Sequence, residues 1–432
     1  MSGIVTVKLW DNIIGYLAYE PGQTEVVTFV YDSEFLKNNI SPSPLLLPLK
    51  QTPYTFDSLS KKSFHGLPGF IADSLPDKFG NQLIDQFFAA KGIAVKEITA
   101  LDRLLYIGNR AMGALSYEPS EDFGSTSDTM LDLASLCELS DIVINSKEKF
   151  TRELNNSKKE QALKLLKVGS SAGGARSKAL VAIDANNKLH DGTLEYTFEC
   201  TYYLLKFDIV GNKDKDSEDP KGMTKVEYIY SLIARECDIM LPDTSFIEDG
   251  DDFHFLIERF DKIYIDGYTA HFHYISWCGI AHADRDGQYS YEQLVLTVRE
   301  LGLGQDSIEE VFRRAIFNLV GRNQDDHTKN FGFLMDAEGN WALSPAFDLT
   351  YSFDPTGKWT KQHQISLNGK KDNFTQEDII AFGKYCNLSK HKSLDILQNI
   401  RKAFLTFEEK ADKFKVSQKL KDTILQNLRI FI

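Results

Sequence analysis

The sequence predicts an α+β fold in three consecutive parts, and three observations support this prediction. Short runs of β-forming residues, separated by Gly, Pro and Asn, fill the N-terminal part of the chain. Strand-like and helical runs then alternate, and from about residue 274 helical patterns dominate to the end. We therefore predict an N-terminal α+β subdomain over residues 1–130, a small mixed lobe over 131–260 and a mostly helical lobe over 261–432.

The composition is that of a globular protein with a sizeable buried core. Of the 432 residues, 42% are hydrophobic and 26% are charged. The sequence contains no run of about 18 apolar residues and no visible secretory signal, so we expect a cytoplasmic protein. The five cysteines are scattered without CxxC spacing, which indicates reduced thiols and no zinc site. A net charge of -13 disfavours autonomous nucleic-acid binding.

In the N-terminal part, β-formers cluster or alternate in three runs, which we predict to be strands over residues 4–10, 13–19 and 26–32. Residues 76–92 are predicted to form a helix that ends at Gly92. The polar stretch over residues 119–129 is predicted to be a linker or an exposed loop.

The two following parts are predicted to be a small mixed lobe and a large helical lobe. In the small lobe we expect a helical stretch over about 130–167 and strands over 180–183, 196–209 and 253–261. An amphipathic helix is predicted over 224–239. In the large lobe we expect helices over 307–321, 394–404 and 418–431, with a hairpin over 331–345. The order is that of a bilobal kinase with an added N-terminal subdomain.

The most informative segment for chemistry is the polar loop over residues 323–330, directly after a predicted buried helix. Asp325 and Asn330 have the D-x-x-x-x-N spacing with which protein kinases orient a hydroxyl and hold magnesium. Asp348 follows the predicted hairpin, which would return it to this loop as a second metal ligand. The alternative is a polar turn in which Asp and Asn serve only turn chemistry.

A run of small residues, GSSAGGARSK over 169–178, lies between a predicted helix and a predicted strand. Small residues let backbone N–H groups approach phosphates closely. The run matches neither a Walker A loop nor G-x-G-x-x-G, and a flexible linker is the alternative.

Two charged residues that follow this run in the small lobe each have a functional and a structural explanation. Lys206 lies in an apolar strand, where burial requires a partner such as an ATP phosphate or a helix glutamate. An edge-strand lysine that points to solvent is the alternative. Glu227 could pair with Lys206, or it could close a capping box with Thr224. Residues 255–262 end a strand where a kinase hinge would present its backbone to adenine.

Taken in order, these segments resemble one family: HipA, the kinase component of bacterial type II toxin–antitoxin pairs. Residues 66–80 and 112–119 resemble parts of its N-terminal domain. Residues 169–181 resemble its phosphate-binding loop, and IERFDK (257–262) resembles its hinge. The catalytic and metal loops of the family resemble NQDDHTKNFGFL (323–334) and SPAFDLTYS (344–352).

The resemblance implies a role for each matching residue, with ATP and Mg2+ as cofactors. Asp325 would orient the substrate hydroxyl, and Asn330 and Asp348 would hold magnesium. His327 and Lys329 are the other candidate catalytic residues; we expect His327 to order the loop by hydrogen bonding, with direct catalysis as the alternative. The implied nucleotide-binding residues form the loop, the strand lysine and the hinge: Ser171, Ala172, Gly173, Gly174, Ala175, Arg176, Ser177, Lys178, Lys206, Glu258, Arg259 and Phe260. The family also implies that the kinase inactivates itself by autophosphorylating a loop serine, here Ser170 or Ser171. Repulsion between the phosphoserine and the site for the ATP phosphates would expel the loop.

The resemblance further implies a HipB-like helix-turn-helix antitoxin dimer, operator DNA contacted mainly through that antitoxin, and a protein substrate such as an aminoacyl-tRNA synthetase. Two other functions remain open. Asp325, Asp326, His327 and Asp348 could ligate a metal in a hydrolase or phosphatase. Alternatively, the chain could be a binding module that only holds a transcription factor.

Overall fold

The structure is a computed structural model that describes residues 3–20, 22, 26–121, 129–145, 149–150, 153–154, 158–170, 176–209 and 220–431. It divides into two compact units, which are described separately. Unit 1 comprises Met1–Lys213, Leu256–Ile275 and Leu334–Asn340, and unit 2 comprises Asp214–Phe255, Ser276–Phe333 and Trp341–Ile432. Three strands contribute residues to both units: β10 (Asp252–Glu258), β13 (His273–Ser276) and β15 (Gly332–Met335).

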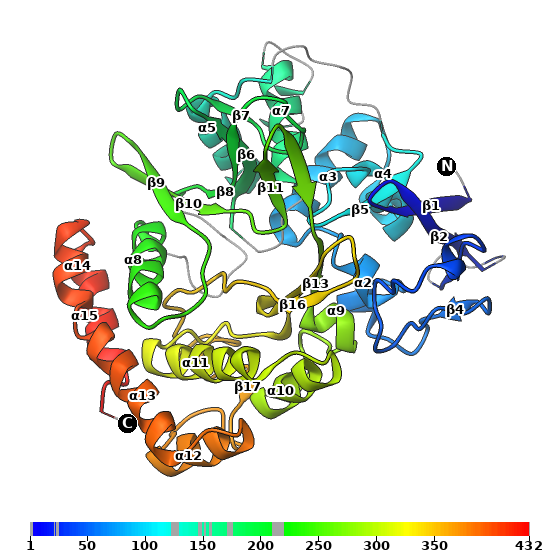
Figure 1. Cartoon of the computed structure of the whole chain (residues 1–432). Coiled ribbons are helices and arrows are strands. Elements are labelled where there is room, and N and C mark those ends of the chain that lie inside the picture. Colours follow the sequence, from blue (N-terminus) through cyan, green and yellow to red (C-terminus); the bar gives the residue numbers. More distant parts are fainter. Residues whose placement is uncertain are drawn as a thin grey trace. The chain divides into compact units, whose positions relative to one another are not determined.

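Unit 1 begins with an antiparallel sheet in the order β4-β3-β2-β1-β5. Alternate residues of β1 are buried, so the period-two pattern of the sequence directs one face of the sheet to the core. Figure 1 shows β1, β2 and β5 together near the N-terminus of the chain. The strands are β1 (Ile4–Leu9), β2 (Asn12–Tyr19), β3 (Val27–Tyr31), β4 (Tyr54–Thr55) and β5 (Leu115–Glu118).

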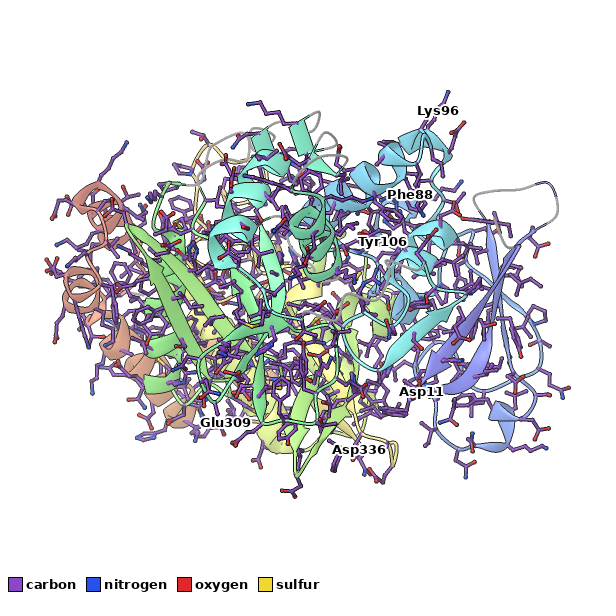
Figure 2. All side chains as sticks on the ribbon, turned by 90° about the horizontal axis from the view of Figure 1, so that it is seen from above. Asp11, Phe88, Lys96, Tyr106, Glu309 and Asp336 are labelled. Carbon is purple, nitrogen blue, oxygen red and sulfur yellow. The ribbon has the colours of Figure 1, made fainter. Side chains whose placement is uncertain are left out.

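The helices of this part of unit 1 lie between strands of the sheet in chain order, after β3 and before β5. Helix α3 carries Phe87 and Phe88, whose rings contact Tyr106 of α4 at centroid distances of 4.9 and 6.2 Å. Figure 2 labels Phe88 and Tyr106 in this aromatic core. The helices are η1 (Phe35–Lys37), α1 (Lys61–Phe64), α2 (Gly69–Ala72), α3 (Lys78–Ala90), η2 (Val95–Glu97) and α4 (Ala100–Ile107).

The rest of unit 1 is a second antiparallel arrangement of strands with helices packed on it. Strand β6 lies between β7 and β8, and α7 packs against β6 and α5. A separate hairpin, β11–β12, follows later in the chain. The elements are α5 (Leu133–Asn145), α7 (Lys159–Gly169), β6 (Lys178–Asp184), β7 (Leu189–Asp191), β8 (Cys200–Lys206), β11 (Lys262–Ile265) and β12 (Tyr268–His271).

Unit 2 is mostly helical. Helix α11 packs against α10, α12 and α13, and α8 packs against α13 and α14. Its helices are α8 (Met223–Glu236), α9 (Trp277–Ala281), α10 (Tyr291–Glu300), α11 (Gln305–Gly321), η3 (Thr328–Asn330), α12 (Gln376–Tyr385), α13 (Lys390–Phe404), α14 (Phe407–Lys413) and α15 (Gln418–Asn427). Its short strands are β9 (Thr244–Asp249), β14 (Tyr289–Ser290), β16 (Trp341–Leu343) and β17 (Ile365–Ser366).

Most predicted elements are present. Of the two explanations of Glu227, the structure excludes the capping box: helix α8 begins at Met223 with Gly222 as its N-cap, so Thr224 lies inside the first turn. The predicted helical stretch over 130–167 includes α5 and α7 in its described part. None of the five cysteines, all of which lie in the described ranges, forms a disulfide. Among the described residues, none of the helices is long and apolar enough to cross a membrane.

Candidate active site

The polar loop predicted to carry the chemistry lies at the end of α11 in unit 2. The helix stops at Gly321 because Arg322 adopts the left-handed conformation, with φ of 54°. The loop then closes in the short helix η3, Thr328–Asn330. The hydroxyl of Thr328 donates to the main-chain oxygen of Ala283 over 2.8 Å. This bond attaches the loop to the segment that follows α9.

Within this loop, Asp325 presents a half-exposed carboxylate from a fixed backbone. Its main-chain N–H donates to Ser352 Oγ over 2.9 Å, and its main-chain oxygen accepts from Asn330 Nδ2 over 2.7 Å. One carboxylate oxygen accepts from Gln364 Nε2 over 2.7 Å. His327 Nε2 lies 3.8 Å from the same oxygen. The side chain is 46% exposed, so a group in solution can reach this carboxylate.

The neighbouring carboxylate, Asp326, points into the protein and is fully buried. Its oxygens accept from Tyr291 Oη, from His363 Nδ1 and from the main-chain N–H of Gln364, each over 2.8 Å. Burial, reinforced by the charge of Asp326, raises the pKa of Tyr291 well above its usual value. Asp326 is therefore an internal anchor of the loop.

This arrangement argues against the metal-hydrolase alternative. That function needs Asp326 as a metal ligand, yet its carboxylate is enclosed by three donors. In the part of the chain that the structure describes, no group of three or more His, Cys, Asp or Glu side chains could hold a metal ion.

Asp348 is the second predicted metal ligand, and the hairpin of β15 and β16 brings its backbone beside the start of the loop. Ser344 N–H donates to Gly332 O over 2.9 Å, and Asn323 Nδ2 donates to the main-chain oxygen of Asp348 over 3.4 Å. Asp348 has φ of 54°, a conformation that Asp tolerates better than most residues. The predicted return of Asp348 to the loop is thus present in the backbone.

The predicted nucleotide-binding residues that the structure describes lie in unit 1. Lys178 of β6 and Lys206 of β8 are directly opposite each other in an antiparallel pair, and both are buried. Opposite residues in such a pair project from the same face of the sheet. The two lysine side chains therefore share one face of this sheet. Ser171 to Ala175 lie outside the described residues.

The predicted hinge has a buried ion pair at its end. Arg259 Nε and Nη2 donate to the two carboxylate oxygens of Asp261 over 3.0 and 2.6 Å. Asp261 also accepts from Gly113 N–H over 2.6 Å. Burial raises the pKa of Asp261, but the charge and hydrogen bonds of Arg259 outweigh it and leave this pKa below its usual value. The Arg259 side chain is therefore engaged structurally, while Glu258 and Phe260 are partly exposed.

The remaining predicted residues have clear positions. Ser170 caps the C-terminus of α7, is fully buried, and donates from Oγ to Leu166 O over 2.6 Å. Ser177 is buried and Arg176 is partly exposed. Lys329 lies in η3 with partial exposure. Sequence reasoning missed the residues that hold Asp325 and Asp326, namely Tyr291, His363 and Gln364; no spacing pattern connects them to the loop.

Two protein-family models match the chain. The model of the HipA N-terminal domain matches residues 5–118, and the model of the HipA-like C-terminal domain matches residues 170–408. The second match alone covers more than half of the 432 residues. The chain belongs to the HipA family. The resemblance seen in the sequence is thereby confirmed.

A solved HipA structure has the same fold. It is HipA of the Shewanella oneidensis MR-1 toxin–antitoxin system, in complex with HipB and its operator DNA. The identity is 16%, the TM-score is 0.68, and the match covers 98% of this chain and 94% of that chain. At this identity the match shows similarity of fold and nothing about function. It confirms the predicted α+β, HipA-like fold class.

A weaker match is the Helicobacter pylori proinflammatory kinase CtkA, with 10% identity and a TM-score of 0.29. It covers 52% of this chain and 92% of that chain, and its TM-score is too low to carry an argument. No curated protein matches the chain.

Proposed function

We propose that this HipA-family protein is an ATP- and Mg2+-dependent serine/threonine protein kinase that acts as the toxin of a type II toxin–antitoxin module. The reaction transfers the γ-phosphate of ATP to a serine hydroxyl of a protein. The observation that carries the proposal is the half-exposed carboxylate of Asp325 on a loop whose backbone is held at both ends. Phosphoryl transfer depends mainly on positioning and electrostatics, which such a loop supplies.

Asp325 is assigned the role of accepting the hydrogen bond of the substrate hydroxyl and orienting it for attack. Gln364 Nε2 occupies one edge of the carboxylate. His327 Nε2 is 3.8 Å from Asp325 Oδ1, too far for a hydrogen bond. His327 is therefore assigned to ordering the loop, since its main-chain oxygen accepts from Asn330 N–H over 2.9 Å. Lys329 is assigned a catalytic role because it lies in η3 of the same loop and carries a positive charge.

Asn330 and Asp348 are assigned as the protein ligands of magnesium. Bound Mg2+ would neutralise charge that develops on the transferred phosphoryl group. The donor set fits this ion, because Mg2+ is usually held by one or two side-chain oxygens together with phosphate oxygens and water. Asn330 donates its Nδ2 to Asp325 O, so its carboxamide oxygen is the atom assigned to the metal.

Lys178 and Lys206 are assigned to the phosphates of ATP, with Arg176 and Ser177 beside them. Both side chains are buried and share one face of the sheet. Lysine is a common ligand of phosphate groups, so a polyanion such as ATP is the ligand that this pair would suit. The loop residues Ser171 to Ala175 and the main chain of Glu258 to Phe260 complete the proposed nucleotide site.

Self-phosphorylation is proposed to occur at Ser170 or Ser171. Ser170 cannot accept a phosphoryl group in the described conformation, because its Oγ is buried and bonded to Leu166 O. The last turn of α7 would have to open first. Phosphorylation would then oppose reclosure, since a buried phosphate carries nearly two negative charges.

The partner proposal rests on family membership and on one relative. The Shewanella oneidensis HipA was solved with HipB and operator DNA. By analogy, this chain would bind a HipB-like helix-turn-helix dimer and reach its operator mainly through that antitoxin. A net charge of -13 suits such a division, because the chain itself would repel bare DNA. The protein substrate is proposed to be a translation component such as an aminoacyl-tRNA synthetase.

Incorporation of phosphate from radiolabelled Mg-ATP into the purified chain, with phosphosite mapping, tests the proposal. We expect incorporation in the wild type, loss by at least about 100-fold in Asp325→Asn, and full activity in Asp243→Asn, a matched change at an exposed carboxylate of unit 2. ATP binding by calorimetry should persist in both variants. A folded wild type that neither binds ATP nor incorporates phosphate would overturn the kinase proposal.

A further inference from the structure

One residue outside the predicted set, Gln364, holds both carboxylates of the loop. Its side-chain Nε2 donates to Asp325 Oδ1 over 2.7 Å, and its main-chain N–H donates to Asp326 Oδ1 over 2.8 Å. Asp325 carries the exposed carboxylate, whereas Asp326 is buried. Gln364 therefore connects the exposed carboxylate to the buried one through a single residue.

A short parallel strand pair places Gln364 at the loop. Strand β17, which begins at Ile365, pairs with β14 in the register Tyr289↔Ile365 and Ser290↔Ser366. Tyr291 follows β14 directly and donates to Asp326. The pairing thus brings two segments more than seventy residues apart in sequence to the same carboxylate. Neither segment belongs to the loop itself.

His363 continues this arrangement toward the C-terminal end of the chain. Its Nδ1 lies 2.8 Å from Asp326 Oδ2, and its Nε2 lies 3.0 Å from Arg429 Nη1. A guanidinium has only donors, so Nε2 must accept and the ring proton must lie on Nδ1. His363 therefore donates to Asp326. The imidazole is completely buried.

Arg429 is itself held from several sides. Its Nη2 donates to Asp372, its main-chain N–H donates to Val320 O over 3.0 Å, and Nη1 also lies 3.3 Å from Leu319 O. Leu319 and Val320 belong to the last turn of α11, directly before the loop. The C-terminal segment thus contacts both the helix that leads into the loop and the histidine that anchors Asp326.

We propose that Gln364 is a positioning residue for Asp325, held at the loop by the hydrogen-bonded chain Asp372–Arg429–His363–Asp326, of which His363 and Asp326 are fully buried. This inference rests on the proposed kinase function for its effect on rate, but its structural half does not. Gln364 Nε2 fixes the rotamer of Asp325, and Arg429 keeps His363 in the tautomer that donates to Asp326. The C-terminal segment therefore works as a latch on the loop.

The first test separates a hydrogen-bond donor from a packing role. Gln364→Ala removes Nε2 but keeps the main-chain bond to Asp326, while Gln364→Glu keeps the shape and places a third carboxylate beside two others. We expect the rate of phosphate transfer at saturating Mg-ATP to fall about 10-fold to 100-fold in Gln364→Ala and further in Gln364→Glu. The Kd for ATP should stay within about twofold of the wild type, because the change affects orientation alone. Gln376→Ala, at the exposed start of α12, is the control.

The second test does not depend on activity. Hydrogen exchange should accelerate at least about tenfold in Arg429→Gln at the amides of Asn330 and Gln364, with α13 and β6 unchanged, because local opening governs exchange. The positioning role would be overturned if Gln364→Ala transferred phosphate at the wild-type rate, or if Gln364→Glu transferred phosphate faster than Gln364→Ala. Unchanged exchange in Arg429→Gln would overturn the latch. If the wild type transferred no phosphate, the proposed function would fail while the exchange result still decided the latch.

Discussion

Asn330 and Asp325 are tied to each other across one turn of the loop: Asn330 Nδ2 donates to the main-chain oxygen of Asp325 over 2.7 Å. The five-residue spacing of these two residues therefore has a structural basis as well as the chemical one proposed for it. The bond uses the nitrogen of the carboxamide and leaves the oxygen for another role. An aspartate at 330 could supply oxygen but could not make this bond.

We therefore expect Asn330→Asp to lose activity as severely as Asn330→Ala, by about 100-fold, although it adds a negative charge for magnesium. The cause is repulsion between the new carboxylate and Asp325 O, which would displace the turn. Rates of phosphate transfer measured across a magnesium titration check this. Recovery of Asn330→Asp at high magnesium would contradict it, because it would show that only metal affinity had changed.

A second prediction concerns the buried ion pair of unit 1. Asp261 accepts from Arg259 and from Gly113 N–H, and both side chains of the pair are nearly fully buried. Asp261→Ala leaves a buried guanidinium without its counter-charge, which costs about 3–5 kcal/mol of unfolding free energy. Urea unfolding measures this loss. Glu34→Ala, which breaks the exposed pair with Lys37, should cost less than about 1 kcal/mol.

Much of the fold could be predicted from the sequence because its elements leave local patterns. Strand β1 alternates buried and partly exposed residues, and α11 repeats apolar residues at helical spacing. The loop from Asp325 to Asn330 could be recognised for the same reason, because its residues lie close together in the sequence and form the D-x-x-x-x-N pattern. The predicted domain bounds and the assigned roles of the site residues remain predictions.

The support of the site could not be predicted, because it depends on long-range pairing. Tyr291 and Gln364 reach Asp326 through β14 and β17, which have two residues each. Two residues are too short to show a period. The choice between the two explanations of Glu227 could not be made from the sequence for a different reason: Thr224 and Glu227 have capping-box spacing, but the N-cap of α8 is Gly222, with φ of 91°.

The pH dependence of stability should contain a contribution from His273. Burial lowers the pKa of His273 to about 4, against the opposing effect of its bond to Pro42 O over 2.8 Å. The unfolded state thus binds a proton at higher pH than the folded state. Stability from the neutral ring is present above about pH 6.5 and falls as the pH drops toward the folded pKa. The full loss is about 3 kcal/mol.

His273→Gln retains a donor for Pro42 O but cannot titrate. Between pH 7.5 and about 4.5, we expect this variant to lose about 2 kcal/mol less unfolding free energy than the wild type. His391→Gln, at an exposed site, should follow the wild type. Some slope should persist in every variant, since burial also lowers the pKa of His282 to about 4. Parallel curves for His273→Gln and the wild type would show that His273 does not contribute.

Gly321, the last residue of α11, provides a test of packing beside the loop. A Cβ there would lie 2.4 Å from Cζ and 3.0 Å from Cε1 of Phe404, and 3.1 Å from Cε1 of Tyr230. We expect Gly321→Ala to lower the unfolding free energy by about 1–3 kcal/mol, because the ring of Phe404 must shift in a packed core. In a Phe404→Leu background the ring atoms of Phe404 are gone, although Tyr230 Cε1 would still lie 3.1 Å away. The same change should then cost clearly less, because alanine also has the better helix propensity. A double-mutant cycle by urea unfolding measures this coupling. Equal costs in both backgrounds would mean that Phe404 is not what makes glycine necessary at this position.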